Sequence, residues 1–174
     1  MADSILERSK YPVTGRAFDE FRVGEEFTTR QLVVSKEMIV QFGELTLDTH
    51  PLHNDEEYCR NTPFGGIIAH GLLGLALIAG LKSEIGLYRG TSVASLGWDN
   101  VRFHGPVPAG AAVHVRVRIA ELKESKRGDR GVLRQATTLL DAEEKPLIEA
   151  EHLMLVLKRA ALPHPPRRSR HCVI

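Results

Sequence analysis

The sequence lacks the features that mark secreted and membrane-bound proteins. Its 174 residues include two cysteines, Cys59 and Cys172, which are too few for a disulfide framework and fit reduced thiols. Long apolar segments are also missing, because the longest such run, residues 71–81, is too short to cross a bilayer. The first residues carry no signal-peptide pattern. We therefore expect a cytoplasmic protein with no membrane partner.

An excess of charge of either sign is absent as well. Lys and Arg together number 23 and Asp and Glu number 22, so the formal net charge is +1. Binding to nucleic acid or to an anionic lipid surface usually requires a basic excess, and this chain offers none. The composition therefore predicts that nucleic acid is not a partner.

The composition that is present suits a single folded domain. Hydrophobic residues make up 43% of the chain and charged residues 26%, values typical of a globular protein of this length. Residues 1–17 are mixed polar and are interpreted as an N-terminal arm. Residues 159–174 are basic and proline-rich, which predicts a disordered tail. The domain itself is predicted to occupy residues 18–158.

Two potential proton-transfer groups, Asp48 and His53, lie five residues apart with Pro51 between them. On an uninterrupted helix they would point roughly 140° apart and could not share a target. Pro51 removes a backbone donor and ends or kinks a helix, so the chain is expected to bend here. A bend can turn the carboxylate and the imidazole toward one point, where they could hold and activate a water molecule.

Helical patterns flank this bend. Ser35 is predicted to cap a helix that ends near residue 47, and Asn54 to cap a short helix that reaches about residue 60. His70 and Gly71 open a run that is apolar on every side as far as Leu81, which predicts a buried central helix over residues 71–85. The Gly71 N–H would be free at the positive end of that helix, where it could bind an oxygen that gains negative charge.

The other regular segments are interpreted as strands. Their β-branched residues and alternating patterns predict strands at 26–34, 91–103, 112–122, 131–140 and 147–157. In the third of these, the valines and Ile119 alternate with His114, Arg116 and Arg118, so one face should be buried and the other polar. Strands joined in sequence predict an antiparallel meander, and the fold class is therefore α+β.

The motif around the bend resembles the signature of the MaoC-like hydratases, the (R)-specific enoyl-CoA hydratase branch of the hot-dog fold. That signature reads Asp-x-Asn-Pro-x-His, followed by an acidic residue, a tyrosine and Phe-Gly-x-x-Ile-Ala-His-Gly. This chain reads Asp48-Thr-His50-Pro51-Leu-His53, Asp55, Tyr58 and Phe64-Gly65-Gly66-Ile-Ile-Ala69-His70-Gly71. His50 stands where the family usually has Asn. The resemblance implies an antiparallel sheet wrapped around a long central helix.

The resemblance also implies an activity, that of a hydro-lyase. Such enzymes add water across a trans-2-enoyl thioester to give the (3R)-hydroxyacyl product, or reverse that reaction, on coenzyme A or an acyl-carrier protein. It implies no cofactor and a homodimer or a larger dimer-based assembly, in which pairing would cover an open sheet edge. Asp48 and His53 would be catalytic, and His50 and Pro51 would support them. The residues expected at the oxyanion or the substrate are Phe64, Gly66, His70 and Gly71.

Three alternatives stay open at this stage. Asp48 and His53 could be a helix cap and a surface imidazole, and His70 could be structural. A hot-dog thioesterase, which needs no histidine five residues after its carboxylate, is a second possibility, and a non-catalytic acyl-CoA-binding protein is a third. The histidines around Asp48 match no zinc-binding spacing, so no metal is expected. Some family members use a serine on the central helix, but the ten residues after Gly71 contain no hydroxyl group.

Overall fold

The computed structural model describes residues 15–162. Most of the predicted arm and tail lies outside these residues. The helical elements are η1 (Phe18–Glu20), α2 (Lys36–Thr46), η2 (Pro51–His53), α3 (Glu56–Arg60), α4 (Gly71–Glu84) and η3 (Arg159–Ala161). The strands are β1 (Glu26–Thr28), β2 (Leu32–Val33), β3 (Ser92–Phe103), β4 (Ala112–Glu124), β5 (Arg130–Leu140) and β6 (Pro146–Leu157).

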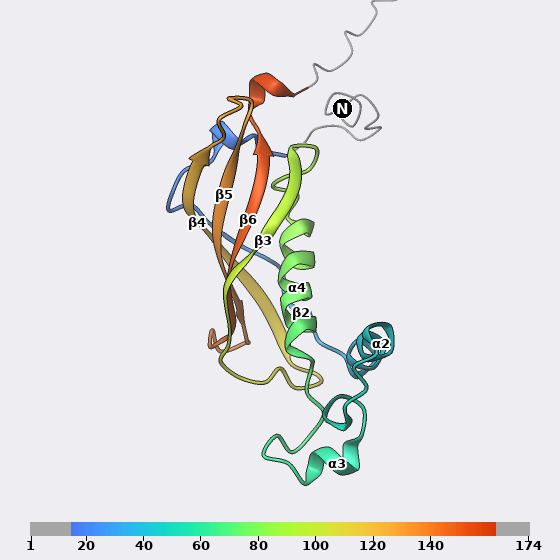
Figure 1. The fold of residues 1–174 in the computed structure, drawn as a ribbon. Helices are drawn as coiled ribbons and strands as arrows, with labels where there is room; N and C mark the ends of the chain where they lie inside the picture. Colours follow the sequence, from blue (N-terminus) through green and yellow to red (C-terminus); the bar gives the residue numbers. More distant parts are fainter. Residues whose placement is uncertain (1–14, 163–174) are drawn as a thin grey trace, which may run out of the picture.

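The strands form one antiparallel sheet in the order β1-β4-β5-β6-β3, with β2 also paired to β4 (Figure 1). The predicted meander holds for β4, β5 and β6, but β3 pairs with β6 and not with β4. The expectation that all strands pair in sequence order is therefore wrong for β3. Residues 104–111 connect the edge strand β3 to β4, which lies on the far side of β5 and β6 in the sheet.

The predicted strand over residues 26–34 is divided into β1 and β2, and Thr29 shows why. Its hydroxyl accepts a hydrogen bond from the Val115 backbone N–H at 2.9 Å, in place of a backbone carbonyl. The same hydroxyl donates to the Arg30 carbonyl at 2.9 Å. The Thr29 side chain thus replaces one backbone hydrogen bond between the strands. Strand β1 therefore ends at Thr28, and β2 begins at Leu32.

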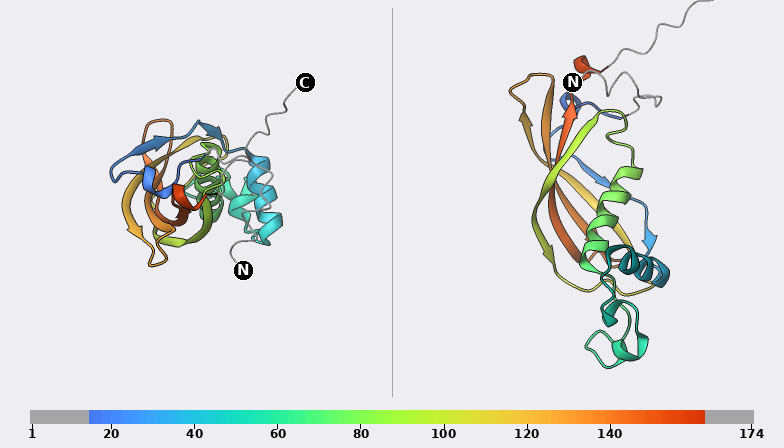
Figure 2. Two further views of the ribbon diagram at one scale, coloured as in Figure 1. Left: turned by 90° about the horizontal axis from the view of Figure 1, so that it is seen from above. Right: turned by 45° about the vertical axis from the view of Figure 1, so that its right-hand side comes forward.

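Helix α4 lies along the concave side of the sheet, which curls around it (Figure 2). This is the arrangement of sheet and central helix that the resemblance implies. Leu73, Ile78 and Leu81 are buried against the strands. The predicted burial of this central helix is confirmed on the face toward the sheet, whereas on the other face of the single chain Leu72 is 64% exposed and Ala76 and Gly80 are also exposed. Apolar residues thus lie on two faces of α4, and the sheet covers one of them.

The alternation predicted for β4 is confirmed on its inner face. Val113, Val115, Val117 and Ile119 are completely buried. Arg116 and Arg118 are exposed on the opposite face, as expected, but His114 on that face is buried. Its Nε2 lies 3.0 Å from a carboxylate oxygen of Glu144 in the β5–β6 turn, so this turn covers a position that the pattern assigns to solvent.

The segment that carries the motif lies beyond the end of the sheet, beside the first turn of α4 (Figure 1). Ser35 caps α2 as predicted, because its side chain accepts a hydrogen bond from the Met38 N–H. The predicted cap of the next helix is wrong. Asp55, not Asn54, caps α3 by accepting from the Tyr58 N–H at 2.9 Å, while Asn54 donates to the Thr49 carbonyl.

Both ends of the described chain pack against the domain. Ala17 and Leu162 are buried together with Leu157, and Arg159 forms an ion pair with Glu20. Residues 15–17 and 159–162, which the sequence analysis placed in the arm and the tail, therefore belong to the packed structure. Within residues 15–162, no helix is long and apolar enough to cross a membrane.

Candidate active site

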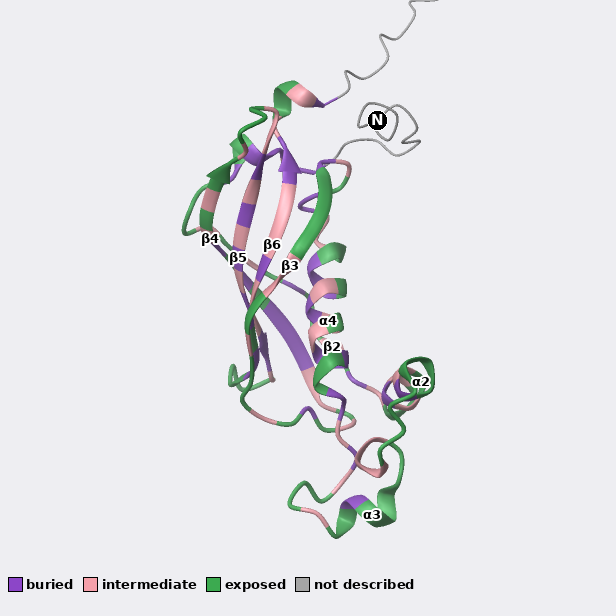
Figure 3. Ribbon diagram, viewed as in Figure 1, coloured by how far each residue is buried: buried purple, intermediate pink, exposed green. Residues whose placement is uncertain are grey.

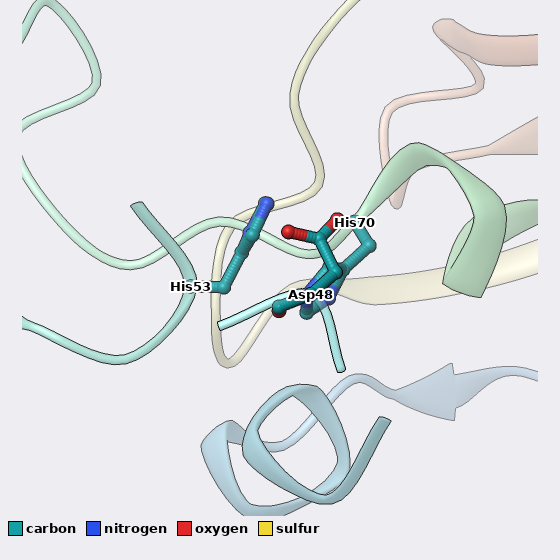
Figure 4. A group of neighbouring side chains, drawn as sticks. All are labelled: Asp48, His53 and His70. Atoms are coloured by element: carbon teal, nitrogen blue, oxygen red, sulfur yellow. The ribbon is translucent and has the colours of Figure 1, made fainter. Parts of the chain in front are cut away.

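Three side chains from separate segments converge beside the N-terminus of α4 (Figure 4). Asp48 follows α2, His53 ends η2, and His70 is the residue that precedes α4. One ligand atom from each lies within 4.8 Å of the others. Asp48 is exposed, His53 is partly buried and His70 is buried. The structure therefore brings together the two predicted proton-transfer groups and adds a third residue to them.

Asp48 is positioned by the end of α2. Leu47 adopts the left-handed conformation with φ of 65°, which a side chain disfavours by about 1–2 kcal/mol. This turn directs the Asp48 carbonyl at His70, whose Nε2–H donates to it at 2.9 Å. Its backbone is thus fixed to the start of α4, while its carboxylate is left free for other contacts. Through this hydrogen bond His70 has a structural role, which was one of the alternatives drawn from the sequence.

The bend at Pro51 is held by hydrogen bonds from its neighbours. Pro51 opens the short helix η2, and His50 caps it by accepting the Leu52 N–H on its Nδ1 at 3.2 Å. Cys59, buried in α3, directs its thiol at the carbonyls of Pro51 and Leu52 at 3.4 and 3.3 Å. Burial raises the pKa of this thiol, so Cys59 acts here as a neutral donor. No pattern in the sequence indicates this role for Cys59.

The hydrogen bonds of His53 define its free nitrogen. Its Nδ1–H donates to the Ile68 carbonyl at 2.7 Å, which leaves the lone pair on Nε2. Burial is the main cause that lowers the pKa of His53, and the neighbouring His70 lowers it further. The two imidazoles stack with their centroids 3.6 Å apart. A neutral imidazole with an unused lone pair suits a general base.

Gly43, in the middle of α2, is a site residue that the sequence analysis missed. A Cβ at this position would lie 2.9 Å from the Asp48 carbonyl oxygen and 3.4 Å from the His70 ring. Any larger residue would therefore push apart the hydrogen bond between Asp48 and His70. The available signal was a glycine inside an amphipathic helix, which weakens the helix and often marks close packing.

Two cavities adjoin the cluster. The smaller, about 260 Å³, is lined by Asp48, His53 and residues of α2. The larger, about 510 Å³, is lined by His70 and Gly71 at the start of α4. Its apolar lining includes Phe64, Ile68, Leu72, Phe103, Val107 and Ile148. A mainly apolar cavity of this size with a few polar groups is typical of a small-molecule site.

The predicted substrate-binding residues are divided between places in the structure. Phe64, His70 and Gly71 line the larger cavity, whereas Gly66 lines a separate hollow near Lys36 and lies outside both cavities of the cluster. Gly71 is the first residue of α4, where backbone N–H groups lack a helical acceptor. A Cβ on Gly71 would meet the Phe103 ring at 2.8 Å, so only glycine lets that ring pack here.

The same three residues could hold a cation. Asp48 offers a carboxylate oxygen, and each imidazole offers one nitrogen, because the other nitrogen of each ring is hydrogen-bonded to a carbonyl. Such a set of nitrogen and oxygen ligands suits several transition metals. The sequence prediction of no metal is not tested by this geometry.

Comparison with known proteins places this arrangement in a family. The sequence model of the MaoC like domain matches residues 19–141. The 3-hydroxybutyryl-CoA dehydratase of Methylorubrum extorquens is 33% identical over 110 residues, which cover 63% of this chain and 68% of that protein. The R-hydratase PhaJ1 of Pseudomonas aeruginosa superposes with a TM-score of 0.67 and 27% identity, over 82% of this chain and 86% of that chain.

A third likeness concerns the fold alone. A Mycobacterium tuberculosis protein described as having a double hot-dog fold superposes with a TM-score of 0.72 and 18% identity. The match covers 89% of this chain and 48% of that one. The antiparallel sheet around α4 is therefore a hot-dog fold. Together with the match over most of the domain, this shows that the chain belongs to the MaoC-like dehydratase family.

Proposed function

We propose that this protein is a hydratase or dehydratase that adds water across a trans-2-enoyl thioester to give the (3R)-hydroxyacyl thioester, or catalyses the reverse. The observation that carries the proposal is the placement of Asp48 and His53 at one point beside the first turn of α4. The named dehydratase and hydratase relatives support the same reaction class. An apolar cavity next to this point suits an acyl chain.

In the proposed hydration, one water molecule binds between the Asp48 carboxylate and the Nε2 lone pair of His53. As the water oxygen bonds to C3 of the substrate, the Asp48–His53 pair takes one of its protons. The pair then gives this proton to C2 on the same face, and the new hydroxyl group keeps the other proton. Atoms and charges balance without a further reactant, so we propose that the reaction needs no cofactor and no metal.

The carbonyl oxygen of the thioester gains negative charge when C3 is attacked. The Gly71 N–H lies at the positive end of α4, and a donor in that position stabilises such an oxygen. Removing one such donor typically costs about 10²–10³ in rate in other enzymes. His70 is then a positioning residue, because its ring binds the Asp48 backbone and stacks on His53.

We further propose a homodimer or a dimer-based assembly formed along β3. This strand is one edge of the sheet, and most of its residues are exposed in the single chain (Figure 3). Val93, Leu96 and Phe103 on β3 and Leu72 on α4 are large apolar side chains at least 44% exposed. Open edges of this kind are usually covered. The double hot-dog fold of the relative supports pairing of two such units.

The proposed partners are an acyl-CoA or acyl-carrier thioester and a second copy of the chain. A cytoplasmic location is proposed as well, since the buried thiol of Cys59 is free. This location fits a thioester substrate that is made inside the cell.

The reaction is tested by following the absorbance of the enoyl thioester with crotonyl-CoA. Asp48→Asn and His53→Gln keep shape and hydrogen bonding but remove proton transfer, so each should lower kcat by about 10²–10⁴. The double variant should lose far less than the product of the two losses, because both groups act on one water. Glu57→Gln, which removes an exposed carboxylate of α3, is the control and should be unchanged.

The same experiment separates the alternatives. A free-thiol assay on the same mixtures reports thioester cleavage, which also destroys the enoyl-thioester band. Thiol release equal to the loss of that band would therefore establish a thioesterase instead, whereas hydration removes the band without releasing thiol. Binding of acyl-CoA with neither reaction would establish a non-catalytic binding protein. Near wild-type hydration by both single variants would refute the proposed Asp48–His53 pair.

A further inference from the structure

One residue that lines the larger cavity, Ile148 of β6, also packs against α4. Ile148 is 1% exposed and lines the cavity at the side of the sheet. Across from it, α4 carries Gly74, one turn after Gly71. A methyl group on Gly74 would overlap Cδ1 of Ile148, so this side chain fills the space that a larger residue on the helix would occupy. Ile148 thus closes the cavity against α4.

Packed side chains lie beyond Ile148. Leu139 of β5 is its direct neighbour in the sheet and is completely buried. Its Cδ2 lies 3.6 Å from the Cβ position of Gly74, so it stands behind Ile148 on the same helix face. Ile78, one turn further along α4, is also completely buried. Neither Leu139 nor Ile78 lines the cavity, which therefore stops at the Ile148–Gly74 contact.

We infer that Ile148 determines how long an acyl chain the site accepts. This inference rests on the proposed function, in which the thioester carbonyl lies at the Gly71 N–H. From there the acyl chain extends into the apolar cavity and meets Ile148, next to the second turn of α4. The side chain at position 148 then sets the maximum chain length.

Opposite changes at this contact should shift chain length in opposite directions. Ile148→Ala removes three carbon atoms from the end of the cavity and makes room for a longer acyl chain. Gly74→Ala forces Cδ1 of Ile148 away from the helix and into the cavity, which shortens it. Each methylene group that becomes buried improves binding by about fourfold. Two further methylene groups in the enlarged cavity correspond to about a 15-fold gain for the longer substrate.

The test measures kcat/KM for trans-2-butenoyl-, hexenoyl-, octenoyl- and dodecenoyl-CoA. Relative to the wild type, Ile148→Ala should raise the ratio of the best long substrate to butenoyl-CoA about tenfold or more. Gly74→Ala should lower that ratio. Ile78→Ala is the matched control, since it makes the same truncation at an equally buried site outside the cavity, and its ratio should stay within about twofold of wild type.

Binding of the saturated acyl-CoA series, measured by calorimetry, gives a readout that is independent of turnover. If the wild type binds these ligands but hydrates none, the proposed function fails. The inference then stands or falls on whether Ile148→Ala shifts binding toward longer chains. An unchanged chain-length profile in Ile148→Ala, or an equal shift in Ile78→Ala, would overturn the inference. Ile148→Val, which removes a single carbon, replaces the alanine variant if that variant does not fold, and should shift the profile in the same direction.

Discussion

Lys82 near the end of α4 is buried without an acidic partner. It is 2% exposed, and it bonds to Nδ1 of His152 while its ammonium lies 5.2 Å from the centre of the Trp98 ring. No carboxylate among residues 15–162 pairs with it. Burial lowers its pKa from 10.5 to about 7. Because each pKa unit is worth about 1.4 kcal/mol, the charged form of Lys82 costs the folded state about 5 kcal/mol.

The sign of the pH dependence follows from this depressed pKa. Between about pH 7 and 10.5 the unfolded chain binds a proton at Lys82 that the folded chain has lost, so the free energy of unfolding rises with pH across that window. Below pH 7 Lys82 is protonated in both the folded and the unfolded chain, so the full cost of burying its charge lowers the free energy of unfolding. We expect Lys82→Met to remove this cost. The gain is reduced by about 1–3 kcal/mol, because Nδ1 of His152 loses its hydrogen-bond partner.

The expected result is a free energy of unfolding about 2–4 kcal/mol higher for Lys82→Met than for the wild type at pH 6. At pH 10 the difference should vanish or reverse. Urea unfolding at both pH values measures it, and Lys145→Met, at an exposed lysine, is the control. Trp98 is the single tryptophan of the chain and stacks on His152, so its fluorescence should titrate near pH 7 in the wild type alone. A difference in unfolding free energy that is the same at pH 6 and pH 10 would refute the reasoning.

Two further predictions concern the site and the assembly. Gly43→Ala should lower kcat at least tenfold, because the added methyl group pushes the Asp48 carbonyl away from His70, even though alanine favours the helix by about 1 kcal/mol. The control is Gly80→Ala, whose Cβ meets nothing within 4 Å and which should keep full activity. Equal activity in both variants would contradict the role of Gly43. Leu96→Lys should weaken the proposed dimer about 100-fold or more, because it places an unpaired charge in the β3 interface. Light scattering measures the mass of this variant and of the control Val23→Lys. An unchanged mass in Leu96→Lys would exclude pairing through β3.

The parts of the fold that the sequence predicts are those specified by near neighbours. The Ser35 cap, the start of α4 at Gly71 and the buried valines of β4 each depend on residues within a few positions. The pairing of β3 with β6 depends on contacts about 50 residues apart, and no local pattern specifies it. Lys82 is a similar case, because lysine is almost always exposed and its burial is decided by the β3 and β6 side chains above it.

The candidate site divides in the same way. Pro51 reveals the bend, so the convergence of Asp48 and His53 could be predicted from the sequence. The contributions of Gly43 and Cys59 could not, because each acts through a backbone carbonyl that only the folded chain brings near. Gly66 was predicted from its place in a motif, and the structure puts it in another hollow.

His70 connects the two halves of the proposed site. Through Nε2 it binds the backbone of Asp48, and as the residue before α4 it stands next to the Gly71 N–H. One side chain therefore fixes the distance between the proposed base and the proposed oxyanion donor. A misplacement of about 1 Å between such groups can cost about 100-fold in rate. An imidazole that never exchanges a proton with substrate can thus be as necessary to the reaction as the two groups that do.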